Sequence, residues 1–132
     1  MGRGLKLLLD THALIWWLTD DPALGAAAEA AISSDQNEVL VSAVSAFEVT
    51  TKFRLGKLPQ AALLAHDFEK AIAQEGFAPL PLSLQHGQLA GRLEVRHKDP
   101  FDRMLIAQAL LESVIFVSNE KLFDEFGIRR LW

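Results

Sequence analysis

The chain has 132 residues, of which 50% are hydrophobic and 23% are charged. This length and composition predict one compact domain over residues 1–132 and exclude disordered, collagen-like and low-complexity proteins. The absence of cysteine excludes disulfide frameworks, thiolate zinc sites and cysteine nucleophiles, and favours a cytoplasmic protein. No apolar run approaches the ~20 residues of a membrane span. The net charge of −4 is not the overall charge of a nucleic-acid-binding protein.

Short apolar runs alternate with longer amphipathic stretches along the chain. The runs predict strands, and the amphipathic stretches between them predict helices. The expected strands are 5–9, 39–41, 114–117 and 128–131, and the expected helices are 10–18, 22–32, 45–55, 59–74, 83–93, 99–111 and 120–126. Residues 77–82 are extended, but Pro79 and Pro81 restrict them to an edge strand or to no strand.

Crossovers of this length imply parallel pairing of the strands. The expected fold is therefore α/β: a three-layer sandwich with an open, mostly parallel sheet of four to five strands and helices on both faces. In such a sheet, the carboxyl ends of the strands share one edge, where ligands bind.

Four acidic residues follow a strand or begin a helix, and they are Asp10, Glu48, Asp102 and Glu120. The topology predicts that they converge at that edge of the sheet. Ionised carboxylates at about 4 Å repel one another by about 4 kcal/mol per pair at an effective dielectric of 20, so a cation is expected between them. Oxygen ligands without thiolate or clustered imidazole suit Mg²⁺ or Mn²⁺. Such an ion suits phosphate chemistry with a metal-activated water.

Each acid also has a purely structural explanation. Asp10 is able to cap the helix that follows it, Glu120 favours a helix N-terminus, and Asp99 is the expected N-cap before Pro100. Ser45 is the expected N-cap of the helix 45–55, and Glu48 completes a capping box with it.

Glu48 also forms an i,i+4 pair with Lys52. The acids taken together favour a site, because Thr11, Ser45 and Ser118 already offer a neutral hydroxyl where a cap is needed.

Three segments resemble the motifs of the PIN-domain nucleases, and specifically the VapC toxins of type II toxin–antitoxin systems. Residues 7–17 (LLLDTHALIWW) are similar to the opening strand-acid-helix motif of that family. Residues 41–49 (VSAVSAFEV), with Lys52, resemble the second motif, and residues 99–109 (DPFDRMLIAQA) resemble the third. The resemblance covers nearly the whole chain.

The resemblance implies that Asp10, Glu48 and Asp102 are the metal ligands and the catalytic residues, with Asp99 as an accessory. At the fourth acidic position, where the family usually has Asp or Asn, this chain has Ser118-Asn119-Glu120. Glu120 is expected to bind through a water, with Asn119 and Asp124 as alternatives. Thr11, Ser118 and Asn119 are expected to support the ligands.

The family reaction is Mg²⁺- or Mn²⁺-dependent cleavage of RNA, tRNA included. The resemblance further implies a VapB-type antitoxin that occupies the site, and a homodimer. Without Asp10, Glu48, Asp99, Asp102 and Glu120, 12 acids remain against 13 bases, so the rest of the chain is not acidic. The basic residues near the second and third motifs are either RNA phosphate contacts or solvated helix ends. The candidate phosphate contacts are Lys52, Arg54, Lys98 and Arg103.

A second hypothesis is a catalytically weak PIN-like domain that acts mainly as a protein-binding module, supported by Glu120 in place of a shorter acid. Trp16 is a candidate contact with an antitoxin or a second subunit, and burial under the second helix explains it equally well. The four histidines lack metal-ligand spacing and are expected to be structural or on the surface. A phosphorylatable receiver domain fits poorly, because Asp10 is followed by Thr11 and His12 and not by a second acid.

Overall fold

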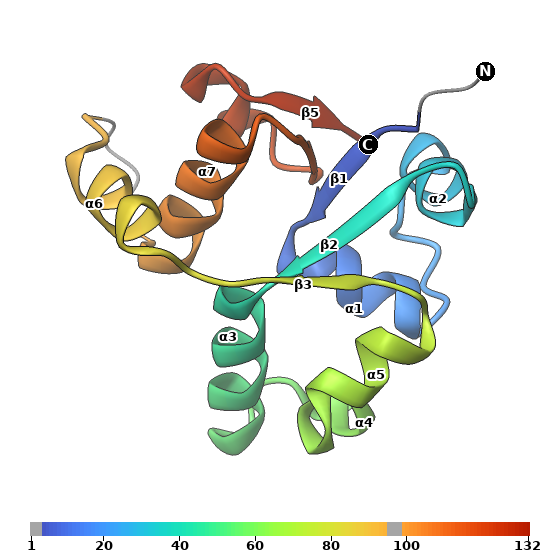
Figure 1. Ribbon diagram of the computed structural model, residues 1–132. Coiled ribbons are helices and arrows are strands. Elements are labelled where there is room, and N and C mark those ends of the chain that lie inside the picture. Colours follow the sequence, from blue (N-terminus) through green and yellow to red (C-terminus); the bar gives the residue numbers. More distant parts are fainter. Residues whose placement is uncertain (1–3, 95–98) are drawn as a thin grey trace.

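A five-stranded parallel sheet forms the centre of the molecule (Figure 1). The computed structural model describes residues 4–94 and 99–132. In this part of the chain the strand order is β3-β2-β1-β4-β5, and every neighbouring pair is parallel. The strands are β1 (Lys6–Leu9), β2 (Glu38–Ser42), β3 (Ala78–Leu80), β4 (Ile115–Val117) and β5 (Arg129–Leu131).

Helices cover both faces of the sheet and make three layers (Figure 1). On one face lie α1 (Thr11–Leu18), α2 (Ala26–Ser33), α4 (Ala62–His66) and α5 (Phe68–Gln74). The other face is covered by α7 (Pro100–Glu112), against which α6 (Leu84–Arg92) packs. The chain also contains α3 (Ala43–Arg54) and two 3-10 helices, η1 (Pro59–Ala61) and η2 (Lys121–Phe126). The three-layer α/β sandwich expected from the sequence is confirmed.

Two hydrophobic cores lie on the two faces of the sheet, because successive strand residues point to opposite sides. Leu7 and Leu9 of β1 belong to the core under α1 and α2. Leu8, between them, belongs to the core under α7. All three leucines are fully buried, which explains why this strand reads as a continuous apolar run.

The second and fourth expected helices differ from the observed ones. The second begins at Ala26 and not near Pro22, because Gly25 is its N-cap and lies against Trp132, where a Cβ would come within 2.7 Å of the indole Cδ1.

The expected helix 59–74 is divided into η1, α4 and α5. Asp67 leaves the helical conformation (φ −147°, ψ 85°) and its side chain accepts a hydrogen bond from Lys70 N. Aspartate is a strong N-cap residue, so a new helix begins there.

The predicted capping box of Ser45 and Glu48 is wrong. Helix α3 begins at Ala43, and its N-cap is Ser42, whose hydroxyl accepts a hydrogen bond from Val44 N at 2.9 Å. Strand β2 therefore runs into α3 without a loop. Ser45 lies inside the helix and is fully buried.

The segment with two prolines forms the edge strand β3. Pro79 pairs with Val41 of β2, and β3 is the last of the described strands on this side of the sheet. A residue without an N–H is tolerated at such an edge. Among the described residues, no helix is long and apolar enough to cross a membrane.

A buried polar network supports the point at which β2 becomes α3. Gln108 of α7 is fully buried. Its Oε1 accepts a hydrogen bond from Ser42 Oγ at 2.5 Å, and its Nε2 donates to Pro81 O at 3.2 Å. Gln108 thus joins α7 to the ends of β2 and β3, and it holds the residue that caps α3.

We expect Gln108→Ala to lower the free energy of unfolding by about 1–3 kcal/mol, because the buried Ser42 hydroxyl and Pro81 carbonyl lose a partner. Urea unfolding followed by tryptophan fluorescence measures the change. Gln85→Ala, on the exposed side of α6, is the matched control and should unfold like the wild type. Equal midpoints for Gln108→Ala and Gln85→Ala would show that the network contributes little.

Candidate functional site

The carboxyl ends of β1, β2 and β4 open into one pocket of about 260 Å³. Asp10 follows β1, Glu48 lies on α3 after β2, and Asp102 lies in the first turn of α7. The pocket is lined by Asp10, His12, Trp16, Glu48, Lys52, Asp99, Asp102, Asn119 and Glu120. The acids that the sequence analysis brought together therefore share one pocket.

Asp10 is held by two hydrogen bonds at the end of the central strand. One carboxylate oxygen accepts from Thr11 N at 2.8 Å, which makes Asp10 the N-cap of α1. The other accepts from the Ser118 hydroxyl at 2.7 Å. The carboxylate is thus oriented by the first residue of α1 and by the residue that follows β4, and Asp10 is only 8% exposed.

Glu48 is held by a hydroxyl and by an ammonium group. Its Oε1 accepts from Thr11 Oγ1 at 2.7 Å, and its Oε2 pairs with Lys52 Nζ at 2.5 Å. Thr11 Oγ1 also lies 2.9 Å from Ser45 Oγ. Because the single Thr11 hydroxyl proton goes to Glu48, Ser45 is the donor to Thr11. Sequence reasoning missed this role of Ser45, although the i,i+3 spacing of Ser45 and Glu48 places them on one face of a helix.

The electrostatics of the pocket are unfavourable for Asp10. The pKa of Asp10 is raised from 3.8 to about 6, chiefly by burial and also by the negative charge of Asp102, although the hydrogen bonds from Ser118 and Thr11 lower it. Partial burial opposes protonation of Lys52, but its hydrogen bond and ion pair with Glu48 raise the pKa of the ammonium group overall. Lys52 therefore stays charged and compensates Glu48, while Asp10 and Asp102 repel each other.

The start of α7 brings two acids to the pocket. Asp99 is the N-cap, and its Oδ1 accepts from Phe101 N at 2.9 Å and from Asp102 N at 3.2 Å. The predicted capping role of Asp99 is confirmed. Asp99 also lines the pocket with Asp102, so the two roles coexist.

Two of the three candidates for the fourth acidic position line the pocket, namely Asn119 and Glu120. Glu120 N donates to Ser118 Oγ at 3.1 Å, so the same hydroxyl that donates to Asp10 anchors this segment. Asp124 does not line the pocket. Its carboxylate pairs with Arg130 at 2.8 Å, an interaction that lowers the pKa of Asp124.

Of the predicted phosphate contacts that lie within the described residues, Lys52 lines the pocket, and Arg54 and Arg103 do not. Arg103 donates to the carbonyl oxygens of Ala90 at 3.0 Å and Leu93 at 2.6 Å, and so holds the end of α6. Arg54 is exposed in the last turn of α3. Lys98 lies outside the described residues.

An aromatic wall closes one side of the pocket. The rings of His12 and Trp16 lie 5.5 Å apart, and Trp16 meets Trp132 edge to face at 5.7 Å. His12 is exposed, as expected, and Trp16 is half-buried. The sequence offered no signal that these two side chains face the acids, because the position of Trp16 depends on the packing of Trp132.

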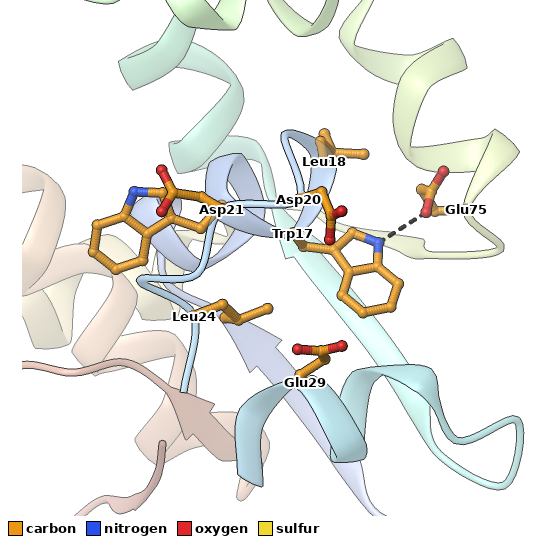
Figure 2. A pocket seen from close by; sticks show the side chains of 8 residues that line it. Trp17, Leu18, Asp20, Asp21, Leu24, Glu29 and Glu75 are labelled. Carbon is orange, nitrogen blue, oxygen red and sulfur yellow. Dashed lines mark hydrogen bonds between the residues drawn. The ribbon is translucent and has the colours of Figure 1, made fainter. Parts of the chain in front are cut away.

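Figure 2 shows a second pocket, of about 280 Å³. This pocket shares Trp16 with the first. Its lining consists of Trp16, Trp17, Leu18, Asp20, Asp21, Leu24, Glu29 and Glu75. Trp17 Nε1 donates to Glu75 Oε1 at 2.8 Å, which ties α1 to the end of α5. Trp16 therefore lies between two acidic pockets, and of these two the first lies at the carboxyl ends of the strands.

The donor set of the first pocket fits a hard divalent cation. Its acids offer oxygen ligands, and a cation would relieve the repulsion between Asp10 and Asp102. Across residues 4–94 and 99–132, no three histidine, aspartate or glutamate side chains are close enough together to form a ready-made metal site. Mg²⁺ commonly binds one or two carboxylates directly and keeps several waters, so this spacing is compatible with such an ion.

The sequence matches the model of the PIN domain over residues 7–128, and the chain belongs to this family. PIN domains are generally nucleases. A search of curated protein sequences finds no match.

Solved structures share the fold. The chain is similar to one in the structure of VapBC2 from Rickettsia felis bound to a DNA fragment from their promoter, with a TM-score of 0.70, 14% identity, and 96% and 98% of the two chains covered. It is also similar to a chain of VapBC-1 from nontypeable Haemophilus influenzae, with a TM-score of 0.67 and 14% identity; 96% of this chain and 97% of that chain are covered. A chain of FitAcB from Neisseria gonorrhoeae has a TM-score of 0.65 and 17% identity, and 96% of each chain is covered.

We expect Asp10→Asn to stabilise the metal-free protein at neutral pH but not in acid. Because the folded-state pKa of about 6 lies above the ordinary value of 3.8, the folded state binds more protons between these values. The free energy of unfolding therefore falls as pH rises from about 4 to 6, by an upper limit of about 3 kcal/mol. The Asn side chain of the Asp10→Asn variant does not titrate, so the variant does not lose this part of the free energy of unfolding as the pH rises.

Urea unfolding in EDTA, at pH 4 and at pH 7.5, measures the difference between variant and wild type. The variant should be more stable at pH 7.5, and the difference should shrink in acid. A difference that does not depend on pH would contradict the assigned environment of Asp10.

Proposed function

We propose that the chain is a divalent-metal-dependent endoribonuclease and the toxin of a toxin–antitoxin pair, working as one PIN domain. The observation that carries the proposal is the meeting of Asp10, Glu48 and Asp102, from three separate segments, around one pocket at the carboxyl ends of the strands. This is the place where doubly wound sheets bind their ligands.

Asp10, Glu48 and Asp102 would hold Mg²⁺ or Mn²⁺, with Asp99 as an accessory ligand. Either Glu120 or Asn119 would complete the set, Glu120 through a water, and Asp124 is the weakest candidate because of its pairing with Arg130. When bound, the ion supplies a hydroxide nucleophile from water and stabilises charge on the phosphate oxygens.

The protein groups around the acids orient them and position the substrate. Thr11 and Ser118 fix the carboxylates of Glu48 and Asp10 by hydrogen bonds. Lys52 lines the pocket with its side chain 32% exposed, so it is placed to contact an RNA phosphate as well as Glu48. In hydrolysis, the water oxygen bonds to phosphorus, one ester P–O bond breaks, and the leaving oxygen takes up a proton.

The proposed partner is a VapB-type antitoxin. The support is the likeness to chains of VapBC structures, together with the acidic lining of the pocket. Such a lining suits a basic side chain, by which an antitoxin could occupy the site. We also propose that the toxin is a homodimer and that its substrates include tRNA.

One observation favours the alternative of a catalytically weak domain that mainly binds protein. Both oxygens of Glu48 are already engaged, one by Thr11 and the other by Lys52. An ion would have to compete with the Lys52 ammonium for Glu48. Metal affinity therefore separates the two functions.

We expect Asp10→Asn and Asp102→Asn each to lower Mn²⁺-dependent cleavage of total RNA by at least about 100-fold, because loss of a ligand costs more than loss of an outer-shell partner. Asp35→Asn, on an exposed turn away from the pocket, is the matched control and should cleave like the wild type.

Mn²⁺ titration by calorimetry accompanies the assay. Wild-type cleavage with full activity in either pocket variant would refute the assigned site. A folded wild type that binds no Mn²⁺ at millimolar concentration and cuts no RNA would contradict the nuclease function and favour the protein-binding alternative.

We further expect the cleavage products to carry no 2′,3′-cyclic phosphate, because the nucleophile is water and not the 2′-hydroxyl of the RNA. Mass spectrometry of a cleaved oligonucleotide identifies the end groups. EDTA should abolish the reaction, and excess Mg²⁺ or Mn²⁺ should restore it. A cyclic phosphate formed in EDTA would indicate metal-independent attack by the 2′-hydroxyl.

A further inference from the structure

Two phenylalanine rings lie beside the acid pocket. Phe47 directly precedes Glu48 in α3, and Phe101 directly precedes Asp102 in α7. The ring centroids are 5.8 Å apart and the ring planes are inclined by 53°. Two segments that supply acids therefore also supply adjoining aromatic rings.

The two rings differ in burial. Phe101 packs against the core under α7, whereas Phe47 is 62% exposed. Phe47 is thus supported from one side by a fixed ring while much of its own surface faces solvent. An aromatic ring that is held in place and still accessible provides a surface on which a flat ligand can stack.

Lys52 connects this aromatic pair to the pocket. Its Nζ lies 5.9 Å from the centroid of the Phe101 ring and 2.5 Å from Glu48 Oε2. The ammonium group has three N–H donors, and the pair with Glu48 takes one of them. A positive group therefore stands between the Phe101 ring of the aromatic pair and Glu48, and a chain of alternating bases and phosphates needs such a group beside a stacking ring.

We propose that the Phe47–Phe101 pair stacks against a base of a single-stranded RNA substrate, while Lys52 contacts the adjoining phosphate. The proposal rests on the nuclease function above and specifies its substrate. In a double helix the faces of the bases are covered by their neighbours, so only an unpaired nucleotide can stack on a side chain. Base–aromatic stacking tolerates any base, so this contact selects unpaired RNA and not a particular sequence.

The first test measures binding in the Asp10→Asn background with Mg²⁺, in which the RNA stays uncut. The probe is a short fluorescein-labelled RNA of random sequence, read by anisotropy, and a self-complementary duplex RNA serves for comparison. We expect Phe47→Ala and Phe47→Leu to raise the Kd for the single strand about 10-fold, and Phe47→Trp to keep it. Duplex binding should not change among these variants.

Leu84→Ala is the matched control, because Leu84 is also an exposed apolar residue, at 91% exposure, but lies on α6. It should leave the Kd of both RNAs unchanged. Circular dichroism of every variant checks the fold. In protein that retains Asp10 and therefore cleaves RNA, Phe47→Ala should raise KM by the same factor as Kd and leave kcat unchanged. This is expected for a residue that binds substrate without taking part in the chemical step.

The second test places an abasic nucleotide at successive positions of an RNA that the wild type cleaves. At one position the missing base should weaken binding to the Asp10→Asn protein about 10-fold and should have no further effect when Phe47→Ala is also present. Such non-additivity identifies the base and the ring as direct partners. If the loss of binding free energy from the abasic nucleotide adds to the loss from Phe47→Ala at every position, the proposal is wrong.

The remaining outcomes are also decisive. If the wild type cleaves RNA and Phe47→Leu binds it normally, the stacking proposal fails and the nuclease function stands. If Phe47→Leu changes only the oligomeric mass or the binding of a protein partner, the ring belongs to a protein interface and the proposal is wrong. If the wild type neither binds nor cleaves RNA, both proposals fall.

Discussion

The repulsion between carboxylates gathered at one edge of the sheet is the constraint on which the rest of the site depends. Asp10 is 8% exposed and Glu48 is 5% exposed, and burial of ionised acids is costly unless they are paired or hydrogen-bonded. The protein compensates them unequally. Glu48 receives the ammonium of Lys52, whereas Asp10 receives two neutral donors and the repulsion of Asp102. Asp10 is therefore the less compensated of the two carboxylates.

The hydroxyl groups around these acids make the site part of the fold. Thr11 links α1 to α3 through Glu48 and Ser45, and Ser118 links β4 to β1 through Asp10. On the opposite face, Gln108 fixes the residue that begins α3. The position of each carboxylate is thus determined by contacts between elements far apart in the chain. This arrangement keeps the acids around one pocket in spite of the repulsion between Asp10 and Asp102.

The acids and the aromatic rings occupy complementary places. Trp16 lines the pocket together with Lys52, and the Nζ of Lys52 lies 5.9 Å from the ring centroid of Phe101, which contacts Phe47. An acidic centre by itself repels RNA. In the proposed nuclease, the aromatic rings and Lys52 would contact the bases and the backbone, so that α3 and α7 would contribute both to substrate binding and to phosphate chemistry.

The sequence by itself determined the strands, most of the helices and the acids at their ends, because apolar runs and N-cap residues act locally. It also indicated that Asp10, Glu48 and Asp102 meet, since the carboxyl ends of parallel strands share an edge. Only the tertiary structure decided that Ser42 and not Ser45 caps α3, that Arg103 holds the end of α6, and that Asn119 and Glu120 but not Asp124 line the pocket. Each of these outcomes depends on which partner a side chain meets across the fold, and the short-range pattern of residues carries no information about that partner.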